Sequence, residues 1–246
     1  MRKGKHSSVF SRLLAMIKLV FVAACVYLGV MGIKQFDYDH AFPFNKVKVY
    51  GINEITQDEL KNTILPFMQH GFFAINIEAL HDKITQNPWV SHVVVKRKWP
   101  DELQITLTER QPVANWNHHA LLSGNGELFT PSSQSHYKDL PLLVGPPNQH
   151  VVMLRYLQNI NRLLNPIHVR IRQLDLNAYA TWKLTLDNGI VLYVGYKDVL
   201  ARINQFVKVY STLQSTEKGT IASVDLRYPN GMAVKWAERE QLEELS

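Results

Sequence analysis

Residues with the chemistry for catalysis or metal binding are few in this chain, and their spacing is unfavourable. His118 and His119 are adjacent, and neighbouring residues of a strand point to opposite faces, so the pair is not expected to bind one ion. Ser123 lies in a Ser-Gly-Asn-Gly run, which differs from the Gly-x-Ser-x-Gly elbow of α/β-hydrolases. We therefore expect no catalytic residue, no cofactor and no metal site.

The acidic residues are expected to serve structure. Asp58, Glu59, Asp101 and Glu102 occupy positions typical of helix caps and turns. The basic residues at 96–98 are interpreted as a solvated strand edge, and the scattered glycines form no phosphate-binding loop. A hydrolase needs a pocket of convergent titratable groups, so this pattern disfavours that class.

The first forty residues predict the location of the rest. Residues 13–33 form an apolar run interrupted only by Lys18, and about 20 helical residues cross a hydrocarbon core of about 30 Å. Basic residues precede the run, and no acidic residue occurs before Asp37. The positive-inside rule then predicts a cytoplasmic tail at 1–12, a transmembrane helix at 13–34 and a single-pass protein whose bulk lies outside the cytoplasm.

Two other interpretations of this segment stay open. A cleaved signal peptide has a shorter apolar core, and Val22-Ala23-Ala24-Cys25 is similar to a lipoprotein cleavage box with Cys25 as lipid acceptor. The chain stays apolar for several residues after Cys25, whereas a mature lipoprotein usually becomes polar at once. This continuation favours an uncleaved anchor.

Charge and composition exclude further classes. Five of the six net positive charges lie at or before Lys18, so the basic balance is a topology signal, and we expect no nucleic-acid binding. A hydrophobic share of 46% and a charged share of 20% are typical of folded protein. Cys25 is the single cysteine, so the external part has no disulfide and depends on packing for its stability.

The pattern after the connector at 35–45 predicts a β-α-α-β-β unit. Alternation indicates a strand at 46–50, and Thr56 with Glu59 forms a capping-box pattern for a helix that Pro66 should end. Asn76 is expected to cap a second helix, which closes at Asn87-Pro88. Strands are predicted at 90–99 and 103–107, separated by a turn at Pro100.

The second external region, from Val113, reads mainly as strands with two helices. Short strands are predicted at 113–116, 121–122, 128–129 and 174–176, helices at 151–164 and 199–210, and hairpins at 182–194 and 224–236. The overall fold class is therefore α+β: a β-α-α-β-β unit after one transmembrane helix, followed by a mainly antiparallel β domain with two helices. A charged tail at 238–246 ends the sequence.

The final strand, 232–236, has no later strand with which its outer side could pair. Such an edge presents unpaired amides and carbonyls that invite another chain unless guarded, and Lys235 could be the guard. Alternatively, a partner strand adds here, with Tyr228 and Trp236 as aromatic anchors and Arg227 as a charge contact.

Specific motifs resemble one family over essentially the whole chain. They are Phe44-Asn45-Lys46-Val47-Lys48-Val49-Tyr50-Gly51, Asn87-Pro88-Trp89-Val90, Arg97-Lys98-Trp99-Pro100-Asp101-Glu102-Leu103 and Glu109-Arg110-Gln111-Pro112-Val113-Ala114. They are similar to the POTRA domain of the bacterial FtsQ/DivIB cell-division family. The resemblance implies a POTRA domain at 44–112, a C-terminal β domain at 113–246, and a non-catalytic divisome scaffold in the inner membrane at the division septum.

The same resemblance implies partners and site residues. In the family the carboxy-terminal hairpin receives FtsB, which is paired with FtsL, and the POTRA region contacts proteins such as FtsK. The partner-binding residues expected from it and from the edge argument are Arg227, Tyr228, Gly231, Met232, Val234 and Trp236. Pro229 and Lys235 depart from the family pattern. A different class, a POTRA-bearing envelope assembly factor or lipoprotein, is the alternative.

Overall fold

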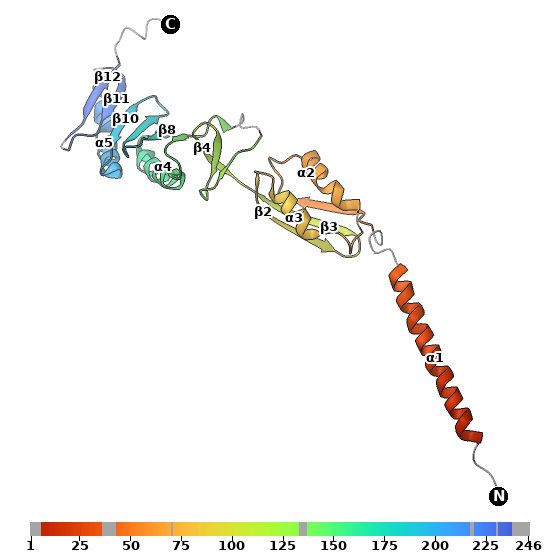
Figure 1. The fold of residues 1–246 in the computed structure, drawn as a ribbon. Helices are drawn as coiled ribbons and strands as arrows, with labels where there is room; N and C mark the ends of the chain where they lie inside the picture. Colours follow the sequence, from red (N-terminus) through yellow and green to blue (C-terminus); the bar gives the residue numbers. More distant parts are fainter. Residues whose placement is uncertain are drawn as a thin grey trace. The chain divides into compact units, whose positions relative to one another are not determined.

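The computed structural model describes residues 6–35, 43–69, 71–132, 137–216, 219–229 and 231–237. They belong to two compact units, which Figure 1 shows in chain order from red to blue. The first unit comprises Met1–Asn87 and His92–Thr108, and the second comprises Pro88–Ser91 and Glu109–Ser246. The charged tail at 238–246 and most of the expected connector lie outside the described residues.

Helix α1 spans His6–Gln35 and contains the long apolar run (Figure 1). Its described side chains, at 16–31, are all exposed, including Cys25. Within the described part of the chain, no helix meets the combination of length and apolar character that a membrane crossing requires.

The first unit is built on a three-stranded sheet in the order β1-β3-β2. Strand β1 spans Lys46–Tyr50, β2 spans Val90–Lys98 and β3 spans Glu102–Glu109. Strand β1 runs parallel to β3, with Val47 opposite Leu103 and Val49 opposite Ile105. Together with two helices between β1 and β2, these strands form the predicted β-α-α-β-β unit.

The helices of this unit begin at the predicted caps. Helix α2 spans Gln57–Ile64, and α3 spans Ile77–Thr85. The Thr56 hydroxyl accepts a hydrogen bond from the Glu59 amide at 3.2 Å, and the Asn76 side chain accepts one from the Ala79 amide at 2.8 Å. The α-helix ends at Ile64, close to the predicted end before Pro66, and the 3₁₀ helix η1, Leu65–Gln69, follows it directly.

The two faces of the small sheet differ sharply. Leu103, Ile105 and Leu107 alternate along β3 and are buried, as are apolar side chains of α2 and α3, which cover this face (Figure 1). On the other face Glu102, expected in a turn, is the first residue of β3 and is buried, and its carboxylate lies 2.8 Å from the Lys48 ammonium. That hydrogen bond lowers the pKa of Glu102. Burial is tolerated because the charge is paired.

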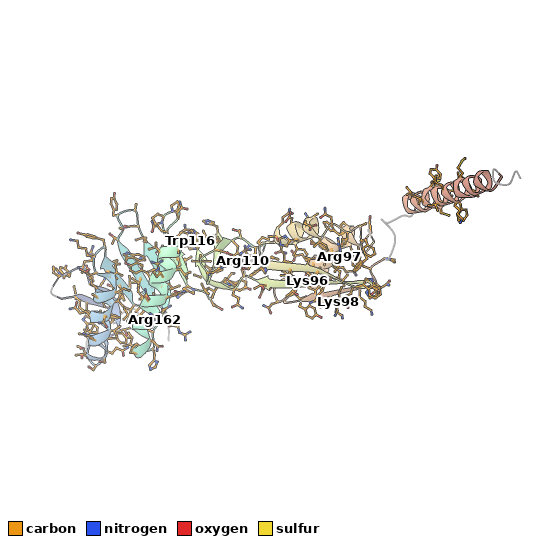
Figure 2. All side chains as sticks on the ribbon, turned by 90° about the horizontal axis from the view of Figure 1, so that it is seen from below. Lys96, Arg97, Lys98, Arg110, Trp116 and Arg162 are labelled. Atoms are coloured by element: carbon orange, nitrogen blue, oxygen red, sulfur yellow. The ribbon has the colours of Figure 1, made fainter. Side chains whose placement is uncertain are left out.

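The basic residues of β2 are not uniformly solvated. Lys96, Arg97 and Lys98 follow one another at the end of this edge strand (Figure 2). The Arg97 guanidinium donates to the Ile75 carbonyl at 2.6 Å, and the Lys98 ammonium lies 3.8 Å from Glu102. Two of the three cations therefore contribute contacts within the unit.

The second unit contains a nine-stranded sheet in the order β12-β11-β10-β9-β8-β7-β4-β5-β6. The strands are β4 Pro112–Trp116, β5 Ala120–Ser123, β6 Leu128–Phe129, β7 Leu142–Val144, β8 Ile171–Leu176, β9 Trp182–Leu186, β10 Val191–Gly195, β11 Ile221–Asp225 and β12 Ala233–Trp236. Most neighbours are antiparallel, but β7 is parallel to both β4 and β8, and β10 is parallel to β11. Strand β7 was not predicted from the sequence.

Two helices supply the crossovers for two of the three parallel pairs. Helix α4, His150–Leu164, continues into the 3₁₀ helix η3, Asn165–Ile167, and connects β7 to β8. Helix α5, Val199–Gln214, connects β10 to β11. One hydrophobic core joins both helices to the sheet, and its side chains include Met153 and Phe206 from the helices and Leu174, Leu184 and Leu192 from successive strands.

The last hairpin differs from the prediction in its boundaries. Strand β11 ends at Asp225, and the Leu226 amide donates instead to the Tyr193 carbonyl of β10 at 2.8 Å. Strand β12 begins only at Ala233. Arg227 and Tyr228, which were expected in the first strand of the hairpin, therefore lie in the connection between the strands.

Candidate partner-binding edge

Strand β12 is the outermost strand on one side of the large sheet. It pairs antiparallel with β11, with Val224 opposite Val234 and Asp225 opposite Ala233. Among the residues that the structure describes, no strand lies on its other side. The backbone of β12 therefore presents an edge of the kind that another extended chain can join.

The alternation along β12 identifies the amides on this edge. The Ala237 amide donates inward, to the Thr220 carbonyl at 2.8 Å. Because successive amides of a strand point in opposite directions, those of Trp236 and Val234 point outward. The β-bulge at Ala222 lies on β11, so the alternation of β12 is uninterrupted.

The side chains of β12 divide between two faces. Val234 and Trp236, together with Met232 just before the strand, are half-buried and pack against the hydrophobic core, whereas Ala233 and Lys235 are exposed. Gly231 has no atom within 4 Å of the position that a Cβ would occupy. The predicted site is thus composite: part of it supports the hairpin from within, and part is accessible.

Arg227 and Tyr228 contribute the accessible part. The Arg227 guanidinium is paired with the Asp225 carboxylate, with Nη2 2.6 Å from Oδ2 and Nε 2.9 Å from Oδ1. The Arg227 amide also donates to Asp225 Oδ1 at 3.0 Å. Tyr228 is 57% exposed beside it. The paired carboxylate fixes the direction of the guanidinium, which stays accessible to solvent.

Two residues that support Arg227 were not recognised in the sequence. The guanidinium lies 6.0 Å from the centre of the Tyr193 ring, and the Arg227 side-chain stem approaches Gly195 so closely that a Cβ there would lie 3.3 Å from Arg227 Cγ. The parallel register of β10 and β11 places Tyr193 opposite Asp225. This arrangement depends on strand order, which local pattern does not reveal.

The Asp225–Arg227 pair leads to a pH prediction. The hydrogen bonds from Arg227 lower the pKa of Asp225 in the folded protein. Because the folded pKa is below the unfolded one, the stabilisation is complete above the unfolded pKa, about 3.9, and is lost as pH falls through the folded value. We expect Arg227→Ala to raise the pKa of Asp225 in a carboxyl-carbon NMR titration. Lys235→Ala, which removes another cation of the hairpin, should leave it unchanged; an unchanged pKa in Arg227→Ala would contradict the pairing.

Trp236 should affect stability as well as binding. Its indole is half-buried against the core, so we expect Trp236→Ala to cost about 2 kcal/mol of unfolding free energy, measured by urea denaturation. Tyr228→Ala removes a more exposed aromatic ring and should cost no more than about 0.5 kcal/mol. Equal losses in the two variants would show that Trp236 is not part of the core.

The residues considered for chemistry have structural contacts. His118 and His119 lie in the turn between β4 and β5, outside the strands predicted at 113–116 and 121–122, and His119 Nδ1 donates to the Asn117 carbonyl at 2.8 Å. The buried Ser123 hydroxyl accepts from the Glu127 amide at 3.0 Å and contacts Asn125. Within the described ranges, no three His, Cys, Asp or Glu side chains form a group that could hold a metal ion.

Arg110 connects two of the motifs noted in the sequence, the one that begins at Asn87 and the one that begins at Glu109. Its guanidinium donates to the Pro88 carbonyl at 2.6 Å and to the Glu127 carboxylate at 2.9 Å, and its amide donates to the Trp89 carbonyl at 2.7 Å. The Trp89 ring also packs edge-on to Phe129. Through these contacts the segment Pro88–Ser91 belongs to the second unit, although it precedes most of strand β2 in the first.

Comparison with known families agrees with this architecture. The family model described as POTRA domain, FtsQ-type, matches residues 42–110, and the model described as Cell division protein FtsQ/DivIB, C-terminal, matches residues 114–227. The fold is thus that of the POTRA-containing cell division proteins.

Individual relatives extend the match to most of the chain. Cell division protein FtsQ of Escherichia coli K12 is 32% identical over 232 residues, which are 92% of this chain and 82% of the relative. The FtsQ proteins of Shewanella oneidensis and Coxiella burnetii are 34% and 32% identical, over 90% and 83% of this chain and 85% of each relative. The chain belongs to the FtsQ family of cell division proteins.

Proposed function

We propose that this cell division protein is a non-catalytic scaffold of the divisome. It binds FtsB, together with FtsL, on the periplasmic side by accepting a strand at the outer edge of β12, and it helps to assemble and regulate the septal peptidoglycan synthesis machinery. The observation that carries the proposal is the position of β12 at the end of a nine-stranded sheet, with its outer edge unpaired among the described residues.

The contacts around the edge suit strand addition. The outward amides of Val234 and Trp236 provide main-chain hydrogen bonds, which give affinity with little dependence on sequence. Arg227 and the exposed Tyr228 lie in the connection between β11 and β12 and supply the charged and aromatic contacts that are frequent at binding hot spots. Strand β12 has only four residues and carries Lys235, which discourages non-specific pairing.

Membrane anchorage completes the proposal. Residues 13–34 serve as a single transmembrane helix, with 1–12 in the cytoplasm and the two units in the periplasm. The support is the apolar run, the basic residues before it and the exposed apolar side chains of α1. Anchorage confines the search for FtsB and FtsL to the membrane plane, at the septum, while the POTRA region remains available to proteins such as FtsK.

Site-specific crosslinking in cells tests the binding edge. A photoreactive residue at Tyr228 should crosslink to FtsB, identified by mass spectrometry. The matched control is Leu128 on β6, an exposed apolar residue of the strand at the opposite end of the same sheet, which should give no FtsB adduct. FtsB adducts of equal yield at both positions, or none at Tyr228, would refute the β12 edge. Protease protection of the external units in spheroplasts would refute the proposed topology.

A further inference from the structure

The first unit contains an apolar groove between strand β1 and helix α2. Its volume is about 520 Å³, and apolar side chains line both walls. Val47 and Val49 form the strand side, while Ile64, Leu65 and Met68 form the helical side. Apolar surface that remains open to solvent in this way is a common sign of a binding site.

The groove lies beside an unpaired strand edge. Strand β1 is terminal in the order β1-β3-β2, and no described residue forms a strand on its far side. Val47 and Val49 lie on the helix-covered face, because they are opposite the buried Leu103 and Ile105. Nevertheless Val47 is 39% exposed and Leu65 is 50% exposed. The groove therefore continues the covered face of the sheet beyond β1, along its open edge.

The opposite face beside β1 is positively charged. Lys46 and Lys48 alternate with the two valines and point away from the groove. The Lys48 ammonium binds the Glu102 carboxylate at 2.8 Å, whereas Lys46 is exposed at the start of the strand. Lys61 adds a cation at the groove itself. A chain lying along β1 would thus meet apolar side chains on one face and cations on the other.

We infer that β1 and α2 form a second strand-addition site, which takes an extended segment of a partner protein with alternating apolar and acidic residues. The apolar residues of the segment enter the groove under α2, and the acidic residues lie next to Lys46 and Lys48. The site is in a different unit from β12, so it does not depend on the function proposed for that edge.

Two short peptides test this site on the full chain in detergent micelles. The probe is a blocked, fluorescent peptide of alternating valine and glutamate, and its comparison has lysine in place of glutamate. We expect saturable binding of the acidic peptide by fluorescence anisotropy, with protection of β1 amides in hydrogen–deuterium exchange. No saturable binding, equal binding of the basic peptide, or protection at β2 or β12 in place of β1 would overturn the inference.

Substitutions in the walls and rim of the groove locate the binding. Leu65→Asp should weaken the acidic peptide by about tenfold or more, because it places a charge in the apolar wall. Leu128→Asp, at a comparably exposed leucine of the second unit, should have no effect. Lys46→Glu, on the solvated face, should shift the preference toward the basic peptide by about threefold. Equal losses in both leucine variants, or an unchanged preference in Lys46→Glu, would overturn the site.

Discussion

Val234→Pro is expected to abolish most FtsB capture while the chain remains folded. Proline removes the outward amide of Val234 but not an amide that pairs with β11, and edge strands tolerate proline when its nitrogen faces solvent. Loss of that hydrogen bond and the steric bulk of the ring should weaken capture by about tenfold or more. A pull-down with purified FtsB and FtsL, at several FtsB concentrations, measures the change.

The control for this variant is Val234→Ala. Alanine removes most of the half-buried side chain but keeps the amide, so its effect on capture should be small. The comparison separates backbone pairing from side-chain packing, which Trp236→Ala alone does not. If alanine and proline reduce capture equally, or if proline leaves it intact, FtsB does not bind by adding a strand at β12.

Gly51→Ala is expected to destabilise the first unit strongly, although the position is exposed. Gly51 follows β1 with φ +83°, and a Cβ at this position would overlap the backbone carbonyl oxygen of Leu107 in β3. Because a strand backbone cannot move aside as a side chain can, we expect a loss of at least about 3 kcal/mol of unfolding free energy. Hydrogen–deuterium exchange during urea unfolding should show the loss in the first unit.

Gly189→Ala is the matched control, because it has the same positive φ as Gly51 but no steric overlap with the added Cβ. Gly189 has φ +86° in the turn between β9 and β10, but nothing lies within 4 Å of its added Cβ. Only the left-handed backbone penalty applies, about 1 kcal/mol, and it should appear in the second unit. Similar losses of unfolding free energy in the two variants would show that the close approach of Gly51 to Leu107 does not determine the cost of a side chain at this position.

Several parts of the molecule follow from local sequence. Thr56 and Asn76 cap their helices as predicted, because a cap hydrogen bond joins residues only three positions apart. The hairpin of β9 and β10 forms at Asp187-Asn188-Gly189, where the Asn188 side chain accepts from the Ile190 amide and Gly189 adopts positive φ. Period-based patterns likewise predicted helices α4 and α5 and most strands, since each is amphipathic by itself.

The candidate site depends on contacts that local sequence patterns do not predict. The sequence alone predicted that Arg227, Tyr228 and the strand at 232–236 belong to one hairpin segment. Tertiary structure decided that β12 is the outermost strand of the large sheet and that β7 lies between β4 and β8. It also decided that β11 ends where the Leu226 amide donates to the Tyr193 carbonyl, and that Asp225 directs the Arg227 guanidinium over the Tyr193 ring. Strand order and these contacts join residues far apart in the chain, so they arise from the packing of whole elements and are not encoded in any short window of sequence.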